Sequence, residues 1–253
     1  DNTDQNNVMA DLHYSIFTIY NENINDNNIA LSYINNSINY DPDNDKYYSS
    51  RAKLYSKIIN ELEKKLLSKN KDSWKYSVSK EIQDISNKAL IDYKKAIELK
   101  DVSINHFNRG MFFKYRLKDD EKALKDFNNA ITNECDINLL DNNNNNSYEM
   151  YFERAKIYSP FETGNANLKN KMKSLMDYQD GYNLYKTITF EEIDKNYAST
   201  FLTKIAEIYF RSLEDYEMAK KYYSESLEIN PNIDILLQRG NTNIKLNDIK
   251  LAE

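Results

Sequence analysis

The segment from Lys88 to Ile131 contains one residue pattern twice. The pattern is a small residue, a ring, a second small residue and an isoleucine. Its first copy is at Ala89, Tyr93, Ala96 and Ile97, and its second copy is at Ala123, Phe127, Ala130 and Ile131. Each position therefore recurs after a step of 34 residues, from 89 to 123. Spacings of three and four residues put these side chains on one helical face. A period of this length predicts an array of repeated helical units.

This pattern resembles the tetratricopeptide repeat, a unit of two antiparallel helices. Between the two copies lies FNRGMFF, residues 107–113, with Gly110 where another backbone comes close. The resemblance implies an all-α fold, a right-handed α-solenoid of antiparallel helix pairs that winds into a superhelix. It also implies a protein-binding scaffold, but it does not identify the protein or peptide that is bound.

Composition agrees with a helical fold. Four glycines and three prolines are few for 253 residues, which disfavours a turn-rich β fold. The formal charge of −6 comes without a basic block, so the sequence lacks the electrostatic signature of nucleic-acid binding. No apolar run approaches the roughly 20 residues that span a membrane.

Little in the sequence indicates catalysis. His13 and His106 are far apart in the predicted array, Cys135 is the single cysteine, and neither a phosphate-binding glycine loop nor a metal-spaced cluster occurs. We therefore expect a non-catalytic scaffold without a cofactor or metal. The alternative is a regulatory or spacer domain of a larger protein, whose catalytic domain would lie outside this chain.

The repeat is expected to form one solenoid over residues 1–253. The expected units are 11–42, 45–100, 104–133, 148–186, 197–231 and a truncated unit at 234–253. A helical insertion at 56–84 would lengthen both helices of the second unit into a hairpin. An asparagine-rich loop at 136–147 and an inserted loop at 159–170 also interrupt the pattern. Trp74, beside the hairpin tip, is either a packing residue or an exposed anchor. Because the last unit is truncated, we expect a piece of a longer protein.

A charge pair follows the repeat. In the first helix of each unit, the residue directly before the repeat's small-residue position is arginine in three units and isoleucine in two. In the second helix, the residue directly before the ring or its equivalent is aspartate in the same three units and tyrosine in the other two. The combinations are Arg51 with Asp92, Arg109 with Asp126, Arg154 with Asp177, Ile16 with Tyr33, and Ile205 with Tyr222. A partly desolvated guanidinium needs a carboxylate, so this pattern predicts three structural salt bridges.

In tetratricopeptide arrays the first helices line a concave groove, which the resemblance makes the expected binding surface. The groove positions are Tyr14 and Thr18, Ser49 and Lys53, Phe107 and Met111, Phe152 and Lys156, Thr203 and Glu207, and Leu237 and Asn241. With Lys114 nearby, they would suit an extended or helical peptide with apolar anchors and acidic character. Alternatively, Phe107 and Phe152 pack in the core. The lysines and asparagines that hold a terminal carboxylate in chaperone-binding members are not reproduced, since Tyr14 and Thr18 occupy the first two places.

Overall fold

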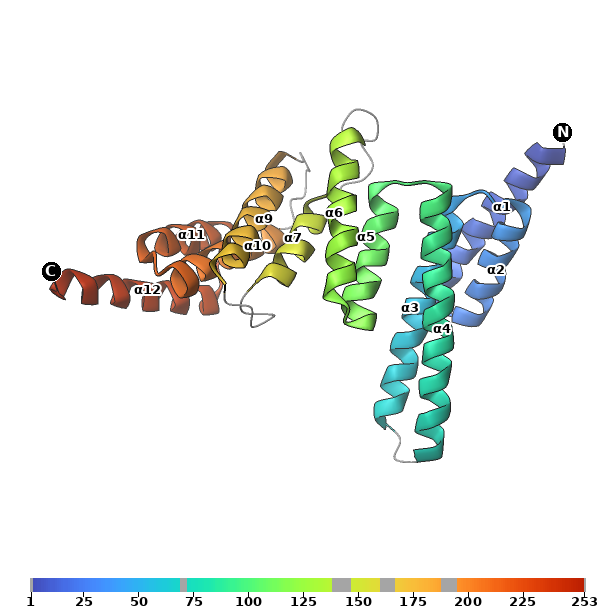
Figure 1. The fold of residues 1–253 in the computed structure, drawn as a ribbon, viewed down its shortest axis with the longest axis horizontal. Helices are drawn as coiled ribbons and strands as arrows, with labels where there is room; N and C mark the ends of the chain where they lie inside the picture. The colour runs from blue at the N-terminus through green and yellow to red at the C-terminus, as the bar shows by residue number, and fades with distance from the viewer. Residues whose placement is uncertain (1, 69–71, 138–146, 160–166, 188–194, 253) are drawn as a thin grey trace. The chain divides into compact units, whose positions relative to one another are not determined.

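The computed structural model describes residues 2–68, 72–137, 147–159, 167–187 and 195–252 (Figure 1). Every regular element within these ranges is a helix, and consecutive helices pack in adjacent pairs. The predicted all-α solenoid architecture of helix pairs is thus confirmed. The chain divides into two compact units, Asp1–Cys135 and Asp136–Glu253, which are described separately below. A single continuous superhelix over 1–253 stays a prediction.

The first unit contains three helix pairs. They are α1 (Asn2–Thr18) with α2 (Asn27–Tyr40), α3 (Asp45–Ser68) with α4 (Asp72–Leu99), and α5 (Ser103–Phe112) with α6 (Asp120–Ile137). Helices α3 and α4 have 24 and 28 residues and run well past their neighbours in the unit (Figure 1). The inserted segment 56–84 therefore lies mostly in two lengthened helices. Residues 69–71 at the tip and the side chain of Trp74 lie outside the described part.

The second unit contains α7 (Ser147–Tyr158) paired with α9 (Leu168–Thr187), and α10 (Lys195–Ile208) paired with α11 (Tyr216–Ile229). A further helix, α12 (Ile233–Ala252), packs against α11. Most of the predicted loops at 136–147 and 159–170 falls on residues 138–146 and 160–166, which lie outside the described ranges. The core of this unit is aromatic and centres on Phe201, which has no exposed surface.

Three first helices end in the same wide turn. The turns are the π-helical segments η1 (Ile19–Ile24), η2 (Phe113–Leu117) and η3 (Tyr209–Leu213). A left-handed residue follows each of them, namely Asn25, Lys118 and Glu214 with φ of 63°, 54° and 56°. An aspartate comes next, at Asp26, Asp119 and Asp215, and its side chain accepts a hydrogen bond from a backbone N–H of the second helix. This carboxylate cap starts the second helix.

The left-handed residue in these turns offers a way to stabilise the fold. Lys118 and Glu214 carry a Cβ in a conformation that costs about 1–2 kcal/mol for an L residue and nothing for glycine. Lys118→Gly and Glu214→Gly should therefore raise the free energy of unfolding by up to about 1 kcal/mol each, measured by urea unfolding. Asn25→Gly is the control and should gain less, because asparagine tolerates this region. A loss of stability in Lys118→Gly would contradict the prediction.

Candidate functional site

The three expected arginine–aspartate pairs join the two helices of their units. In each pair the arginine Nε and Nη2 donate to the two carboxylate oxygens. The N···O distances are 2.7 and 2.7 Å for Arg51 with Asp92, 2.7 and 2.7 Å for Arg109 with Asp126, and 2.9 and 2.7 Å for Arg154 with Asp177. The aspartates are buried, whereas each arginine retains about a fifth of its surface. Each of these charges is therefore paired within its own repeat, where it holds the two helices together.

The two units without this ion pair contain a ring stack in its place. Tyr33 lies against Tyr20 with ring centroids 5.8 Å apart and an interplanar angle of 13°. Tyr222 lies against Tyr209 at 5.6 Å and 8°. The tyrosine of the second helix therefore packs on a ring of the first helix, where no guanidinium needs a carboxylate. This contact explains why isoleucine occurs together with tyrosine in the sequence.

Glycine is needed where a ring crosses the first helix. A Cβ on Gly110 would lie 2.7 Å from Cε1 of Phe127, whereas a Cβ on Gly240 of α12 would meet no atom within 4 Å. Gly110→Ala should cost about 1–3 kcal/mol of unfolding free energy, because the ring must move. Gly240→Ala is the matched control and should gain up to about 1 kcal/mol from helix propensity. Equal effects in urea unfolding would contradict this account.

His106 adds a titratable group to the Arg109–Asp126 pair. Its Nε2 lies 2.6 Å from Oδ1 of Asp101, in the connection before α5, and its Nδ1 lies 3.5 Å from Oδ1 of Asp126 on α6. The bond with Asp126 and then that with Asp101 raise the pKa of His106, although burial opposes them. Burial raises the pKa of Asp126, but hydrogen bonds from Arg109 and His106 outweigh it, so this pKa lies below its ordinary value.

The raised pKa of His106 predicts a dependence of stability on pH. Protonated His106 stabilises the fold fully below the unfolded pKa of about 6.5, and this contribution is lost as the pH rises through the higher folded pKa. The stability difference between the parent and His106→Gln should therefore shrink as the pH rises above about 6.5, measured by urea unfolding. The lowered pKa values of Asp101 and Asp126 leave their own contributions constant over this range. A constant difference would contradict the prediction.

Side-chain hydrogen bonds hold the first helices of the first unit side by side. The hydroxyl groups of Tyr14 on α1 and Ser50 on α3 are 3.0 Å apart. Asn108 on α5 donates to Ser49 Oγ on α3 at 3.1 Å. Arg116 in η2 donates to Glu63 on α3 at 2.8 Å. The helices α1, α3 and α5 therefore form one continuous wall within this unit.

Two of the expected groove residues are buried in the packing between helices. Phe107 is 5% exposed and packs on Phe127 of α6, at a centroid distance of 5.8 Å. Ser49 is also buried, through its bond with Asn108. We therefore correct the expectation for Phe107 and Ser49, because neighbouring helices cover both side chains.

Three other first positions are half-buried. Phe152 lies 5.4 Å from the ring of Tyr178, Thr203 Oγ1 lies 3.0 Å from Ser226 Oγ, and Tyr14 packs on rings. On α12, Leu237 is exposed.

The second position of each pair lies further outward. Lys53 and Asn241 are exposed, and the other second positions, Thr18, Met111, Lys156 and Glu207, are half-buried. The nearby Lys114 is half-buried as well. Several carry local contacts: Lys156 donates to Glu153 at 3.2 Å, Lys204 donates to Glu207 at 3.1 Å, and Lys114 lies over the ring of Tyr115. The accessible part of the expected groove is therefore mainly this second set.

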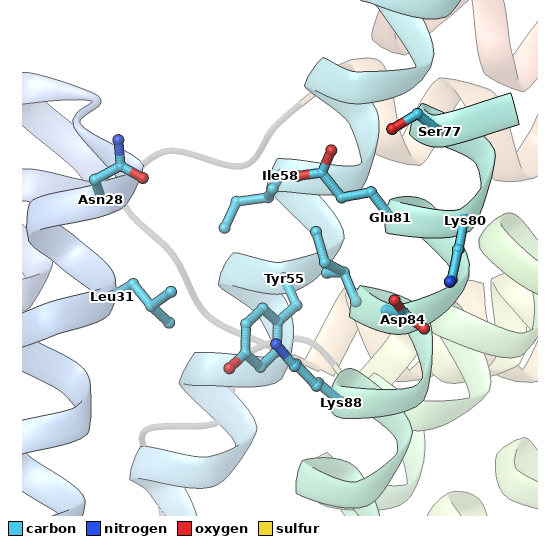
Figure 2. Close-up of a pocket in the computed structure, with 10 residues that line it drawn as sticks. Asn28, Leu31, Tyr55, Ile58, Ser77, Lys80, Glu81, Asp84 and Lys88 are labelled. Atoms are coloured by element: carbon cyan, nitrogen blue, oxygen red, sulfur yellow. The ribbon is translucent and has the colours of Figure 1, made fainter. Parts of the chain in front are cut away.

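The sequence did not predict an open cleft of about 430 Å³ in the first unit. Figure 2 shows α2, α3 and α4 around it. Its apolar part consists of Leu31, Tyr55, Ile58 and Ile85, and its polar part consists of Asn28, Ser77, Lys80, Glu81, Asp84 and Lys88. The cleft forms where the lengthened α3 and α4 pass the start of α2.

The described residues show no other site chemistry. Among them, no group of three or more histidine, cysteine, aspartate and glutamate side chains could hold a metal ion. No helix in the described ranges is both long enough and apolar enough to cross a membrane.

A family model for the tetratricopeptide repeat matches residues 199–233, which include most of α10, all of η3 and α11, and the turn that follows. Residues 199–233 are therefore identified as a tetratricopeptide repeat. One similar solved structure is described as "Functional Characterization of Pseudomonas Aeruginosa pilF". It shares 13% identity at a TM-score of 0.58, over 96% of this chain and 89% of that chain. The likeness in fold thus covers nearly the whole chain and not only the matched repeat.

A second solved structure, PilW, described as a widely conserved type IV pilus biogenesis factor, matches at a TM-score of 0.46 with 14% identity, over 90% of this chain and 97% of that chain. No curated protein matches the sequence. Tetratricopeptide-repeat proteins bind protein partners, and the fold supports the role of a protein-interaction scaffold.

Proposed function

We propose that this chain is a non-catalytic scaffold that binds a segment of a partner protein along its first helices. The observation that carries the proposal is the wall of α1, α3 and α5, with Lys53 exposed and Met111 half-buried. A surface that includes a lysine and a thioether would suit a peptide that carries a carboxylate and an apolar side chain. Lys156 and Glu207 occupy the corresponding positions of the second unit.

The cleft in Figure 2 is a second candidate surface. Its lining combines apolar side chains with cations and carboxylates, which would suit a partner segment that carries an apolar side chain and charged groups. A partner that bound here would contact α2 and the hairpin of α3 and α4 instead of the expected groove. The two surfaces can be separated by mutation, because they share no residue.

The test is capture of proteins from a lysate of the source organism by the parent and three variants. The groove variant is Lys53→Glu with Met111→Ala, the cleft variant is Lys80→Glu with Lys88→Glu, and the control is Lys125→Glu on exposed surface of α6. Phe107 is left unchanged because it is buried. Circular dichroism first checks that each variant folds.

A protein retained by the parent and the control but lost by the groove variant is the expected result. Loss from the cleft variant alone would assign binding to the cleft. Equal capture by all four proteins would contradict both surfaces, and capture by none would contradict the scaffold role in this chain.

A further inference from the structure

The hairpin of α3 and α4 projects past the other helices of the first unit. Arg116 of η2 donates to Glu63 of α3 at 2.8 Å, and α3 continues beyond this contact to Ser68. Helix α4 begins at Asp72, so the last turn of α3 and the first turn of α4 lie together at the tip (Figure 1). We call residues 64–67 of α3 and 75–76 of α4 the hairpin end.

Two large side chains of the hairpin end are mostly in contact with solvent. Leu67 is 88% exposed and Tyr76 is 76% exposed, the two largest values for apolar or aromatic side chains of this size among the described residues. The hairpin buries Ile59 and Val78 instead, so its own packing does not use Leu67 or Tyr76. Exposed apolar groups that gather in one place mark surfaces that contact a protein or a membrane.

The hairpin end is also basic, although the chain is acidic. Residues 64–76 include five lysines and a single acidic residue, whereas the whole chain has a formal charge of −6. Lys64 and Lys65 on α3 are exposed, and Lys75 on α4 is half-buried. Such a cluster attracts an anionic surface from a distance of roughly 10 Å at physiological salt.

This chemistry fits an anionic bilayer better than a peptide or a nucleic acid. The end of a two-helix hairpin is convex, so it cannot enclose a peptide as a concave site does. An aliphatic side chain such as Leu67 adds little to the binding of phosphates, which lysines alone would bind. At a bilayer surface, by contrast, leucine and tyrosine enter the boundary between headgroups and acyl chains, while lysines attract anionic headgroups.

We propose that the hairpin end docks on the surface of a bilayer that contains anionic lipids. Leu67 and Tyr76 enter the headgroup boundary, and Lys64 and Lys75 lie among the anionic headgroups. The hairpin end shares no residue with the expected groove or with the cleft. The proposal therefore goes beyond the scaffold role, and either can fail alone.

Trp74 allows contact at this end to be measured, because it is the single tryptophan of the chain and lies next to Lys75 in the sequence. Its fluorescence emission is recorded while vesicles are added to the 253-residue chain. Co-sedimentation with the vesicles measures the bound fraction. One preparation is phosphatidylcholine with about a quarter phosphatidylserine, and the other is phosphatidylcholine alone.

Two double variants test the two parts of the hairpin end. The apolar variant is Leu67→Ser with Tyr76→Ser, and its control is Ile91→Ser with Met176→Ser, which removes exposed apolar side chains elsewhere. The charge variant is Lys64→Gln with Lys75→Gln, and its control is Lys125→Gln with Lys220→Gln on exposed surface of α6 and α11. Circular dichroism first checks that each variant folds.

We expect the Trp74 emission to shift to shorter wavelength with phosphatidylserine vesicles, and binding to pure phosphatidylcholine to be at least about tenfold weaker. Each hairpin variant should bind the phosphatidylserine vesicles at least about fivefold more weakly than the parent, whereas both controls should bind as the parent does. Added salt should weaken the binding of the parent.

Four results would overturn the proposal. They are absence of binding to both preparations, equal binding to both, equal binding by the hairpin variants and their controls, and co-sedimentation without a change in Trp74 emission, which would place the contact elsewhere. Poly-glutamate and single-stranded DNA are added as further probes. A shift of the emission with either of them, but not with vesicles, would assign the hairpin end to an acidic protein or to a nucleic acid.

Discussion

Asp126→Ala is expected to lower the free energy of unfolding of the first unit by about 3 kcal/mol, measured by urea unfolding. The substitution leaves the Arg109 guanidinium without its two hydrogen bonds, and it removes one of the two carboxylates that face His106. A buried charge that loses its partner usually costs about 3–5 kcal/mol. The lower value applies here because Arg109 keeps 22% of its side-chain surface in contact with solvent.

The chain provides its own control for this experiment. In the fifth unit, Ile205 and Tyr222 occupy the places of Arg109 and Asp126, and Tyr222 stacks on Tyr209. The double variant Arg109→Ile with Asp126→Tyr copies this arrangement onto α5 and α6, where Phe113 could receive the new ring. It should be at least about 1 kcal/mol more stable than the sum of the single variants implies. Additive losses would show that the ion pair and the ring stack are not interchangeable.

The sequence was sufficient to predict these ion pairs, because several units of one chain can be compared with each other. Arginine and aspartate change together with isoleucine and tyrosine, and such a joint change indicates contact. The helix pairs followed in the same way from the 34-residue period. The four buried residues of α2, Ala30, Ile34, Ser37 and Ile38, have the same spacing as the repeat pattern that begins at Ala89.

The width of the buried face could not be predicted from the same pattern. Phe107 and Met111 are four residues apart and share one side of α5, yet Phe107 is covered by α6 and Met111 is half-buried. An amphipathic period indicates that a helix has a buried side, but a neighbouring helix decides how far that side extends. The cleft depends on neighbours even more strongly, since it requires α3 and α4 to pass the start of α2.

A buried position that the repeat pattern missed lies five residues before the small residue of four first helices, α3, α5, α7 and α10. It holds Tyr47, Asn105, Met150 and Phe201, all with at most 4% exposure. The chemistry differs each time: Tyr47 donates to Asp11, Asn105 donates to Asp45 and to two backbone carbonyls, and Phe201 meets rings. Because no residue type recurs there, sequence periodicity does not mark the position.

Phe201→Ala should be the most damaging substitution in the second unit, at about 3–5 kcal/mol of unfolding free energy. Phe201 has no exposed surface and contacts rings from three helices. These rings are Tyr148 and Phe152 of α7, Tyr178, Tyr182 and Tyr185 of α9, and Tyr197 of α10. Removing the ring leaves a cavity, because side chains anchored on three helices cannot all move in to fill it.

Two variants distinguish this cavity from the general loss of an aromatic residue. Phe210→Ala removes a half-buried ring of the same unit, which packs on Tyr216, and should cost about 1 kcal/mol. Phe201→Leu keeps most of the volume and should cost less than Phe201→Ala. Hydrogen exchange in α9 and α10 provides the measurement, since both helices contact the ring. If Phe201→Ala opened these helices no more than Phe210→Ala does, the aromatic cluster would not be the core that joins α7, α9 and α10.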